Sequence, residues 1–535
     1  MAKIYKWSEL VSDVVIKFIS ESICEIITDN YTLAELKYRM RFRPKDYFFA
    51  PSYKIGKWDG WINLIKQNKL AVGLIPLLCE KMQDLKISFE IDNRYFPTYK
   101  VTKNQIIEYS KLLNLQSKGI DITPREHQIN GVLNSLQNKR VVLLSATNSG
   151  KSLILYIYIR FLLDILNLNK ILLLVPNTML VEQMYDDFTD YSTKNKWNVE
   201  KNCQRIYSEI KENNRDMNKR VHISTWQSLY TKDPEIFNVY DAFICDEVHT
   251  AKGNSIQFIS SNCINAAYRL GCTGSLTGDH IDEYTIRGSF GSVYQVIDNK
   301  EMISKNYSTP LDIKVIMLKY NENLCKSFKW LSYQDEVKLI CECKERNIFI
   351  AKLINGFTDK NTLILFDKIK HGMNIYKTIK SLLPDRKIFF ISGEIKTQVR
   401  NKIKDYIDNS SERGLILIAT YQTFSTGINL KNLHNLIFAS PFKSRVRLLQ
   451  SLGRMLRKAQ NKDNATVYDL VDDLTYKSYK NNIFKHFSEY RLPEYDKSGF
   501  NCKIIKRNVE TVTNENEFLE KAKYEKEKTK NQIIH

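Results

Sequence analysis

With 535 residues the chain is expected to form three or four domains, and 43% hydrophobic residues are enough for packed cores, which excludes a largely disordered protein. Lys and Arg number 80 against 60 Asp and Glu, and the formal net charge of +20 favours a polyanionic partner such as nucleic acid. A basic protein whose charge only prevents aggregation is the alternative. The sequence contains no run of about 18 apolar residues, so no membrane span is expected, and its N-terminus lacks the apolar core of a signal peptide. The cysteines are scattered and lack the spacing of a zinc site.

Residues 1–115 are expected to form a small α+β domain with a basic surface. Between residues 37 and 61, cationic side chains are interleaved with aromatic ones. The cations that we expect to contact nucleic acid are Arg39, Arg41, Arg43 and Lys57. The three arginines alternate with apolar residues, as on a half-buried strand with one cationic face. Such a face suits a phosphate backbone, and aromatic side chains can stack on bases. A solvated basic strand over an aromatic core is the alternative.

A linker is expected at residues 116–125, and a short helix then leads to VVLLSATNSGKS at residues 141–152. This stretch predicts a buried strand, a small polar loop and the start of a helix, which is the context that a P-loop needs. Backbone N–H groups of the loop offer partial positive charge to phosphates. Lys151 is expected to reach the β- and γ-phosphates, and the Ser152 hydroxyl is expected to help hold Mg²⁺. Taken alone, the triplet Gly-Lys-Ser also fits an ordinary helix N-terminus.

Polar residues follow the next predicted strands of this series. Strand 170–175 ends in Pro176-Asn177-Thr178, and strand 221–224 ends in Thr225-Trp226-Gln227. Such residues at the carboxyl edge of an α/β sheet are well placed to bind ligands, although helix capping explains the threonines as well.

Two carboxylates, Asp246 and Glu247, directly follow the predicted strand 242–245. Downstream of a P-loop they predict the second half of a phosphoryl-transfer site, in which Asp246 holds Mg²⁺ through water and Glu247 orients or deprotonates the attacking water. Strand 267–271 then leads to a small turn, Thr273-Gly274-Ser275, at the same edge.

A second series of alternating strands and helices begins near Leu311, which suggests two α/β lobes with a cleft between them. In the predicted helix 444–458, Gln450, Arg454 and Arg457 are spaced to share one side. That side is expected to meet a nucleotide, with Arg supplying charge in the transition state; an exposed basic face is the alternative.

In this order the motifs resemble those of the superfamily-2 helicases, and up to about residue 490 the chain more closely resembles the phage UvsW helicase family. The resemblance rests on a DExH box at residues 246–249, on the turn Gly56-Lys57-Trp58-Asp59-Gly60 and on Ser392-Gly393-Glu394 followed by Arg400. Asn148, Gly274 and Asn429 depart from the commoner residues of these motifs.

The resemblance implies functional positions. Those implied to bind the nucleotide are Arg125, Gln128, Thr147, Asn148, Ser149, Gly150, Lys151, Ser152, Gly427, Asn429 and Gln450. Those implied to be catalytic are Lys151, Asp246, Glu247, Arg454 and Arg457, with Ser152 and Asp246 as metal positions. Those implied to bind nucleic acid, beside the N-terminal cations, are Pro176, Asn177, Thr178, Thr225, Trp226 and Thr420.

The fold implied is α/β: two tandem RecA-like lobes, at residues 116–305 and 306–490, after the N-terminal α+β domain and before a polar charged tail at residues 491–535. The activity implied is ATP- and Mg²⁺-dependent remodelling of branched DNA, namely branch migration, fork regression and unwinding of R-loops in phage recombination, replication and repair. Branched or double-stranded DNA, RNA–DNA hybrids and a single-stranded-DNA-binding protein are the partners to consider. We expect a cytoplasmic protein with reduced thiols, in a bacterial host if a phage encodes it.

Two alternatives stay open at this point. A DExH RNA helicase would share every ATPase motif. A motor or clamp subunit of a restriction-type complex would share them too, although no Glu-x-Lys triplet follows a convincing acidic strand end.

Overall fold

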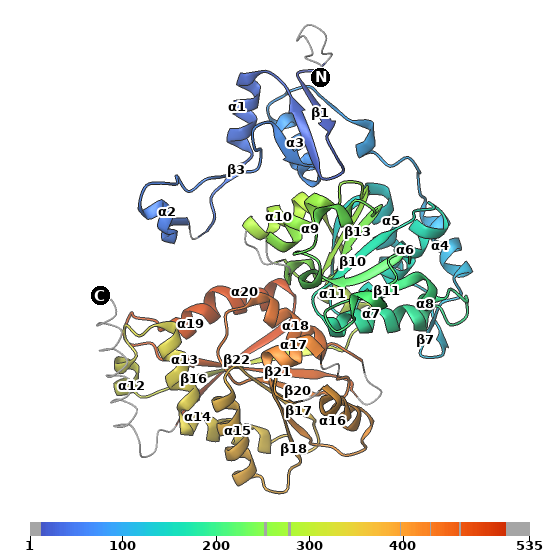
Figure 1. The fold of residues 1–535 in the computed structure, drawn as a ribbon. Helices are drawn as coiled ribbons and strands as arrows, with labels where there is room; N and C mark the ends of the chain where they lie inside the picture. Colours follow the sequence, from blue (N-terminus) through green and yellow to red (C-terminus); the bar gives the residue numbers. More distant parts are fainter. Residues whose placement is uncertain are drawn as a thin grey trace. The chain divides into compact units, whose positions relative to one another are not determined.

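The computed structural model describes residues 12–45, 47–250, 254–276, 280–395, 397–427, 430–458 and 462–509 (Figure 1). The chain divides into two compact units, Met1–Ile297 and Asp298–His535. Among the described residues, every helix is too short or too polar to cross a membrane. All ten cysteines are unpaired, and eight of them are buried.

The N-terminal domain is built on a four-stranded sheet with the order β5-β2-β1-β6. The strands are β1 (Val14–Phe18), β2 (Ile23–Ile27), β5 (Lys69–Ala71) and β6 (Phe89–Ile91). Buried and half-buried residues alternate along β1 and β2, as expected for strands with one face on a core. Two helices, α1 (Asn30–Arg39) and α3 (Ile75–Asp84), supply Leu36 and Leu78 to that core.

The expected strand with Arg39, Arg41 and Arg43 on one face is wrong. The Asp29 side chain caps α1, and the helix continues to Arg39, whose Nε lies 2.7 Å from Glu35 on the same helix. Only Arg41 and Phe42 form a short strand, β3, which pairs with β4 (Ile62–Asn63). The alternation was misleading because the capped helix α1 ends inside it. Strands β3 and β4 and the described residues between them, including α2 (Pro51–Lys54), form an arm that we call the aromatic arm.

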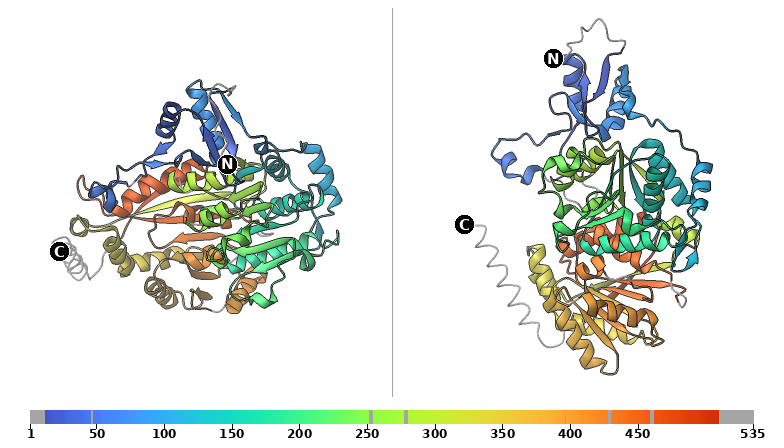
Figure 2. Two further views of the ribbon diagram at one scale, coloured as in Figure 1. Left: turned by 45° about the horizontal axis from the view of Figure 1, so that its top comes forward. Right: turned by 45° about the vertical axis from the view of Figure 1, so that its right-hand side comes forward.

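The first lobe carries a parallel seven-stranded sheet with the order β11-β12-β10-β13-β14-β9-β15 and helices on both faces (Figure 2). The strands are β9 (Arg140–Ser145), β10 (Ile171–Val175), β11 (Cys203–Ile206), β12 (Val221–Thr225), β13 (Ala242–Cys245), β14 (Tyr268–Thr273) and β15 (Ser292–Ile297). The helices include α4 (Lys103–Leu112), α5 (Glu126–Asn138), α6 (Lys151–Asp164), α7 (Thr178–Tyr191), α8 (Val199–Asn202), α9 (Asn254–Asn262) and α10 (His280–Phe290). Because helices cover both faces, the central strands read as continuous apolar runs.

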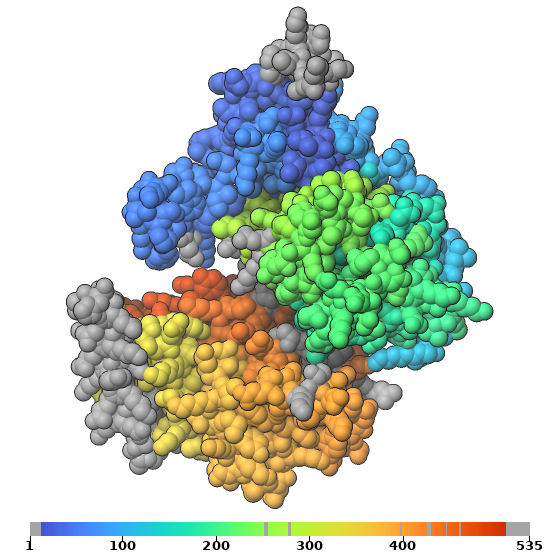
Figure 3. All heavy atoms as spheres, viewed as in Figure 1, coloured from blue at the N-terminus to red at the C-terminus, as the bar shows by residue number. Residues whose placement is uncertain are grey.

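A buried polar network fixes the N-terminal domain to the first lobe. Arg269 of β14 is only 1% exposed, and its guanidinium donates to Ser22 Oγ at 2.7 Å and to the Ser260 carbonyl at 3.0 Å. Beside it, Glu21 forms a buried ion pair with Arg140 of β9. These groups find part of their partners only across the domain boundary, so separating the two domains would leave buried charges unpaired. Figure 3 shows the blue atoms of the N-terminal domain packed against the green atoms of this lobe.

The second unit repeats the strand order of the first lobe. Its sheet runs β18-β19-β17-β20-β21-β16-β22, so each strand holds the place of its counterpart seven strands earlier. The strands are β16 (Leu311–Lys319), β17 (Thr362–Phe366), β18 (Ile388–Ile391), β19 (Ile416–Thr420), β20 (Asn435–Phe438), β21 (Ala465–Asp473) and β22 (Asn501–Asn508). The helices include α11 (Asn299–Ser304), α12 (Glu322–Ser327), α13 (Tyr333–Glu342), α14 (Lys344–Asn355), α15 (Ile369–Leu382), α16 (Thr397–Asn409), α17 (Tyr421–Gly427), α18 (Arg445–Met455), α19 (Asn482–His486) and α20 (Leu492–Lys497).

The segment expected to be a polar tail from residue 491 contains ordered elements. Helix α20 and strand β22 lie in it, and β22 pairs in parallel with β16 along its whole length. β22 is polar and largely exposed because it is an edge strand, which is why its sequence does not show a buried-strand pattern. Residues 510–535 of the expected tail lie outside the described residues.

Candidate nucleotide and nucleic-acid sites

The loop between β9 and α6 has the backbone of a phosphate-binding loop. Asn148 and Gly150 both have positive φ angles, 67° and 84°, which turn successive N–H groups toward one side. The φ of Gly150 favours glycine, because a side chain is strained in this conformation, and a Cβ atom here would also lie 2.1 Å from Gln128 Nε2. Gln128 Nε2 and His127 Nε2 each lie 2.9 Å from the Ser149 carbonyl oxygen. Two side chains of α5 therefore hold this loop in place.

Lys151, at the start of α6, is paired with a carboxylate of the DExH sequence. Its Nζ lies 2.8 Å from Glu247 Oε1, and the side chains are only 13% and 20% exposed. Burial would lower the pKa of Lys151 and raise that of Glu247, but their mutual attraction outweighs burial, so the Lys151 pKa rises and the Glu247 pKa falls. Both groups are therefore charged. The Glu247 carboxylate binds the Lys151 ammonium group, which a phosphate would otherwise bind.

The turn after β14 supports Glu247 from the other side. The Gly274 backbone N–H hydrogen-bonds to the Glu247 carboxylate. His249 Nδ1 lies 3.3 Å from Glu247 Oε2 and 2.5 Å from Thr273 Oγ1. Burial lowers the pKa of His249, although the Glu247 charge opposes that shift. The predicted turn at residues 273–275 is thus joined to the carboxylate that we expect to orient water.

The residues predicted to hold Mg²⁺ fit such an ion. Burial and the charge of Glu247 raise the pKa of Asp246 to about 6, and among the described residues its Oδ1 atom is buried without a hydrogen-bond partner. The Ser152 hydroxyl lies 2.9 Å from the Tyr191 hydroxyl of α7 and also hydrogen-bonds to Asp187. One carboxylate and one hydroxyl suit Mg²⁺, because this ion keeps waters and phosphate oxygens as its other ligands.

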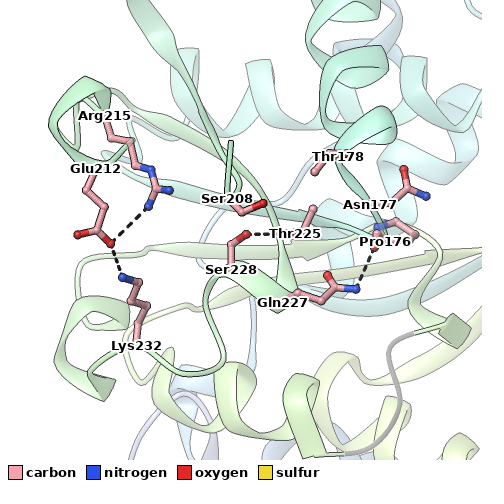
Figure 4. Close-up of a pocket in the computed structure, with 10 residues that line it drawn as sticks. All are labelled: Pro176, Asn177, Thr178, Ser208, Glu212, Arg215, Thr225, Gln227, Ser228 and Lys232. Atoms are coloured by element: carbon pink, nitrogen blue, oxygen red, sulfur yellow. Dashed lines mark hydrogen bonds and ion pairs between the residues drawn. The ribbon is translucent and has the colours of Figure 1, made fainter. Parts of the chain in front are cut away.

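A groove of about 470 Å³ lies at the carboxyl edge of the same sheet (Figure 4). Four residues predicted to bind nucleic acid line it, namely Pro176, Asn177, Thr178 and Thr225. The Asn177 side chain caps α7 by accepting from the Leu180 N–H at 3.0 Å, and Thr225 Oγ1 lies 2.8 Å from Ser228 Oγ. The polar strand ends therefore do gather at one edge, as the sequence predicts.

Trp226 does not line this groove with its neighbours, and the expectation that it contacts nucleic acid is wrong. Its side chain is 8% exposed and packs in the hydrophobic core of the lobe with Leu229 and Phe237. Burial of the large apolar indole in the core is favourable, whereas its polar neighbours Thr225 and Gln227 remain at the edge of the sheet.

The predicted nucleotide residues of the first lobe lie around the phosphate loop. Thr147 lies half-buried against Gly274, whereas Asn148 is exposed. Arg125 is the N-cap residue of α5, and its backbone N–H donates to Gln128 Oε1 at 2.8 Å. The Gln128 amide is thus bonded to backbone at both ends, and adenine recognition by Arg125 and Gln128 stays a prediction.

In the second unit the predicted three-residue face of α18 is incomplete. The helix ends at Met455 and is capped at Leu456, so Gln450 and Arg454 lie on it, whereas Arg457 lies beyond it. The helix stops because the Thr309 N–H binds the Leu456 carbonyl at 2.8 Å and draws the chain toward the start of β16.

Arg457 is nevertheless held in a defined place. Its carbonyl accepts from Thr309 Oγ1 and from Lys462 Nζ, each at 3.1 Å. Burial lowers the pKa of its guanidinium to about 10, although the charge of Asp408 opposes the shift. Among the described residues, Arg457 Nη1 is buried without a partner, so this cation has unused donor capacity.

Thr420, at the end of β19, shares a pocket of about 480 Å³ with Gln450, Arg447 and Glu394. The Thr420 hydroxyl donates to Thr423 Oγ1 at 2.6 Å. Gly427 is the last residue of α17, and Asn429 lies outside the described residues.

The aromatic arm presents cations on aromatic surface. The guanidinium groups of Arg41 and Arg43 lie 4.3 and 4.7 Å from the Trp61 ring centre. Arg43 and Lys57 are exposed, whereas Arg41 is half-buried. Stacked guanidinium groups keep their outward edges for a phosphate or a base.

Several residues that shape these sites were not predicted from the sequence. His127 and Tyr191 contact the phosphate loop and Ser152, and Arg215 and Lys232 line the groove. Arg215 and Lys232 lie in a polar region without a motif, where cationic and acidic residues are balanced, so no local sequence signal pointed toward them. Tyr191 is the last residue of α7, and no spacing rule relates it to Ser152.

Known families match the three parts of the chain. The N-terminal family of the DNA helicase UvsW matches residues 13–92, the family of the type III restriction enzyme res subunit matches residues 121–277, and the helicase conserved C-terminal domain matches residues 345–459.

Relatives and solved structures agree with these matches. The ATP-dependent DNA helicase uvsW of Enterobacteria phage T4 is 31% identical over 478 residues, which cover 89% of this chain and 94% of that protein. The crystal structure of T4 UvsW covers 93% of this chain and 100% of that chain with a TM-score of 0.50 and 30% identity. The type ISP restriction-modification enzyme LlaBIII shares the fold over 76% of this chain and 33% of its own, with a TM-score of 0.53 and 15% identity. With this identity, this coverage and a matching N-terminal family, the chain belongs to the UvsW family of superfamily-2 ATP-dependent DNA helicases.

Proposed function

We propose that this helicase uses ATP hydrolysis to remodel branched DNA, by branch migration, fork regression and unwinding of R-loops. The observation that carries the proposal is the aromatic arm on a domain that a buried polar network fixes to the lobe with the phosphate loop. A motor that only tracks along one strand needs no such attachment. A cationic and aromatic surface held at a constant position on the motor lobe suits a duplex beside a branch point.

ATP is bound in this proposal by the loop Thr147–Ser152, with Lys151 on the β- and γ-phosphates. Mg²⁺ held by Ser152 and Asp246 would neutralise phosphate charge during transfer. Glu247 orients the attacking water, and the Gly274 N–H and His249 keep its carboxylate in position. Arg454 and Arg457 of the second unit supply positive charge to the transition state. Gln450 and the segment 425–429 contribute contacts to the nucleotide.

One DNA strand lies in the groove of the first lobe and is held by Pro176, Asn177, Thr178 and Thr225, with Thr420 as the contributing residue of the second lobe. These groups reach phosphates and sugars, so binding is independent of base sequence and sensitive to salt.

The test is a set of strand-displacement assays with the full chain on a Holliday junction, a fork and an R-loop, with and without ATP. We expect ATP-dependent conversion of all three substrates and stronger ATPase stimulation by forked DNA than by structured RNA. Stimulation by structured RNA alone would overturn the assignment to DNA. ATP-dependent binding to the junction without strand exchange would indicate a clamp instead, and Mg²⁺-dependent cleavage would indicate a nuclease component.

A further inference from the structure

One end of the groove in the first lobe carries a charge cluster that no motif of the helicase explains. Of the ten residues that line the groove, three are charged, namely Glu212, Arg215 and Lys232 (Figure 4). Lys232 Nζ forms an ion pair with Glu212 Oε1, and Arg215 Nη1 lies 3.8 Å from the same oxygen atom. One carboxylate therefore lies between two cations, at the end opposite to Pro176 and Asn177 in Figure 4.

The two cations differ in how firmly they are held. The Arg215 guanidinium donates to the Ile210 carbonyl at 2.6 Å and to the Tyr207 carbonyl at 3.0 Å, and its side chain is 12% exposed. The Lys232 side chain is 40% exposed and its long stem is flexible. Arg215 is thus a built part of the groove wall, and Lys232 can follow a ligand.

Glu212 has few bonds that would keep it there. It lies in a short exposed turn, and its side chain is 67% exposed. The hydrogen bond from Lys232 is the main cause of its lowered pKa, so the carboxylate is ionised at neutral pH. An ionised carboxylate between Arg and Lys occupies the place that a phosphate group of similar charge would take.

We propose that Arg215 and Lys232 form a phosphate subsite at the end of the strand groove, and that Glu212 is an internal competitor for it. The proposal rests on the proposed function, because it takes the ligand to be the phosphate backbone of the strand in this groove. A strand phosphate displaces Glu212 when it binds, and Glu212 returns when the phosphate leaves. This exchange limits affinity and speeds release, which a protein that moves along a strand needs at every step.

The experiment measures binding of a fluorescent oligo-dT strand to the full chain by anisotropy at several KCl concentrations, with release rates by stopped flow. Glu212→Gln is expected to bind roughly threefold or more tightly, to release the strand more slowly, and to steepen the log–log salt dependence by about 0.7, the increment for one phosphate contact on a single strand. Lys232→Gln is expected to weaken binding and to flatten the slope by the same amount.

Glu209→Gln is the matched control. Glu209 lies three residues before Glu212, is exposed and does not line the groove, so this variant removes the same charge outside the groove. Equal tightening in Glu209→Gln and Glu212→Gln would overturn the proposal, since net charge would then explain both. Unchanged affinity and slope in Glu212→Gln and Lys232→Gln, with unaltered melting temperatures, would overturn it as well.

Thr178→Val with Gln227→Ala, at the other end of the groove, separates the subsite from the proposed function. If this variant loses affinity while the Glu212 and Lys232 variants do not, the subsite is wrong and the strand groove stands. If none of the variants changes binding, the groove itself is not the strand site, and that part of the proposed function fails together with the subsite.

Discussion

At the scale of single residues, the carboxylate that we propose to be catalytic is paired with the lysine of the phosphate loop. Glu247 is bonded to Lys151, and its backbone φ of 50° lies in the left-handed region, which is uncommon for a non-glycine residue. The ion pair neutralises Lys151 before a nucleotide arrives. In the proposed mechanism, a bound phosphate takes Lys151 away from Glu247, and the carboxylate then orients water.

This exchange predicts different results for the two partners. Glu247→Gln should lower DNA-stimulated ATP hydrolysis by about 100-fold or more while ATP affinity is kept or increased, because the competing charge is gone. Lys151→Ala should lower both hydrolysis and ATP affinity. Nucleotide titrations and steady-state ATPase assays measure the two effects, and hydrolysis near the wild-type rate in Glu247→Gln would contradict the role given to it.

The burial of His371 in the second unit predicts a contribution to stability that depends on pH. His371 is 2% exposed, and its Nδ1 lies 2.7 Å from Ser440 Oγ; burial, and then the charge of Arg346, lower its pKa to about 3. In the unfolded chain the imidazole of His371 has a pKa near 6.5, so as pH falls the unfolded state binds a proton before the folded state does. The contribution of neutral His371 to stability is therefore lost as pH falls from about 6.5 toward 3, by at most about 1.4 kcal/mol per pH unit.

Calorimetric melting curves between pH 4.5 and 7.5 test this contribution. We expect a shallower fall of melting temperature below pH 6.5 in His371→Gln than in the wild type. His280→Gln, at an exposed histidine, serves as the control and should follow the wild type. Parallel curves for His371→Gln and the wild type would show that His371 is not the group responsible.

At the scale of elements, the cations in and beside the aromatic arm fall into two classes. Arg39 lies outside the arm, at the end of α1, and is paired with Glu35, whereas Arg43 and Lys57 lie exposed on the arm itself. Gly60 allows the return of the arm, because its φ is 83° and a Cβ atom would lie 2.5 Å from the Tyr47 ring. The arm, rather than a cationic strand, is therefore the surface that offers charge.

This division predicts the effect of neutralising each class. Arg43→Gln with Lys57→Gln should lower affinity for forks and junctions and flatten the log–log salt dependence by roughly two units, one for each phosphate that no longer meets a cation. ATPase at saturating single-stranded DNA should be preserved, because the motor lobes are unchanged. Junction-binding isotherms at several salt concentrations measure the slope, and Arg39→Gln is the control. A larger change in Arg39→Gln than in the double variant would contradict this assignment.

At the scale of the whole molecule, the N-terminal domain and the first lobe form one compact unit. Gly73 shows how close they are, since a Cβ atom there would lie 2.1 Å from the Arg287 carbonyl oxygen of α10. Close backbone packing and the Glu21–Arg140 pair together join the N-terminal domain, which carries the arm, to the lobe that holds the phosphate loop.

This connection predicts that the arm and the motor can be uncoupled at their boundary. Glu21→Gln leaves Arg140 buried without its counter-charge, which typically costs about 3–5 kcal/mol for a buried pair. We expect stronger hydrogen exchange in β1 and β2 and a greater loss of junction remodelling than of ATPase stimulated by single-stranded DNA. Glu80→Gln breaks an exposed pair of the same domain and should change neither. Equal losses of remodelling and ATPase in Glu21→Gln would contradict the uncoupling.

The elements whose sequence signal is local could be predicted from the chain alone. The parallel strands β9, β10 and β13 are predictable because strands buried on both faces must be apolar throughout. The phosphate loop is predictable because glycine, lysine and serine at that spacing follow from its chemistry.

Features that depend on residues far apart in the chain could not be predicted and became visible in the three-dimensional structure. Tyr191 meets Ser152 across 39 positions, and Ser22 meets Arg269 across 247. Trp226 turns into the core and β22 completes an edge because of the elements packed beside them. Burial and hydrogen bonding are properties of the surroundings of a residue, and for these residues the surroundings come from parts of the chain that no local pattern describes.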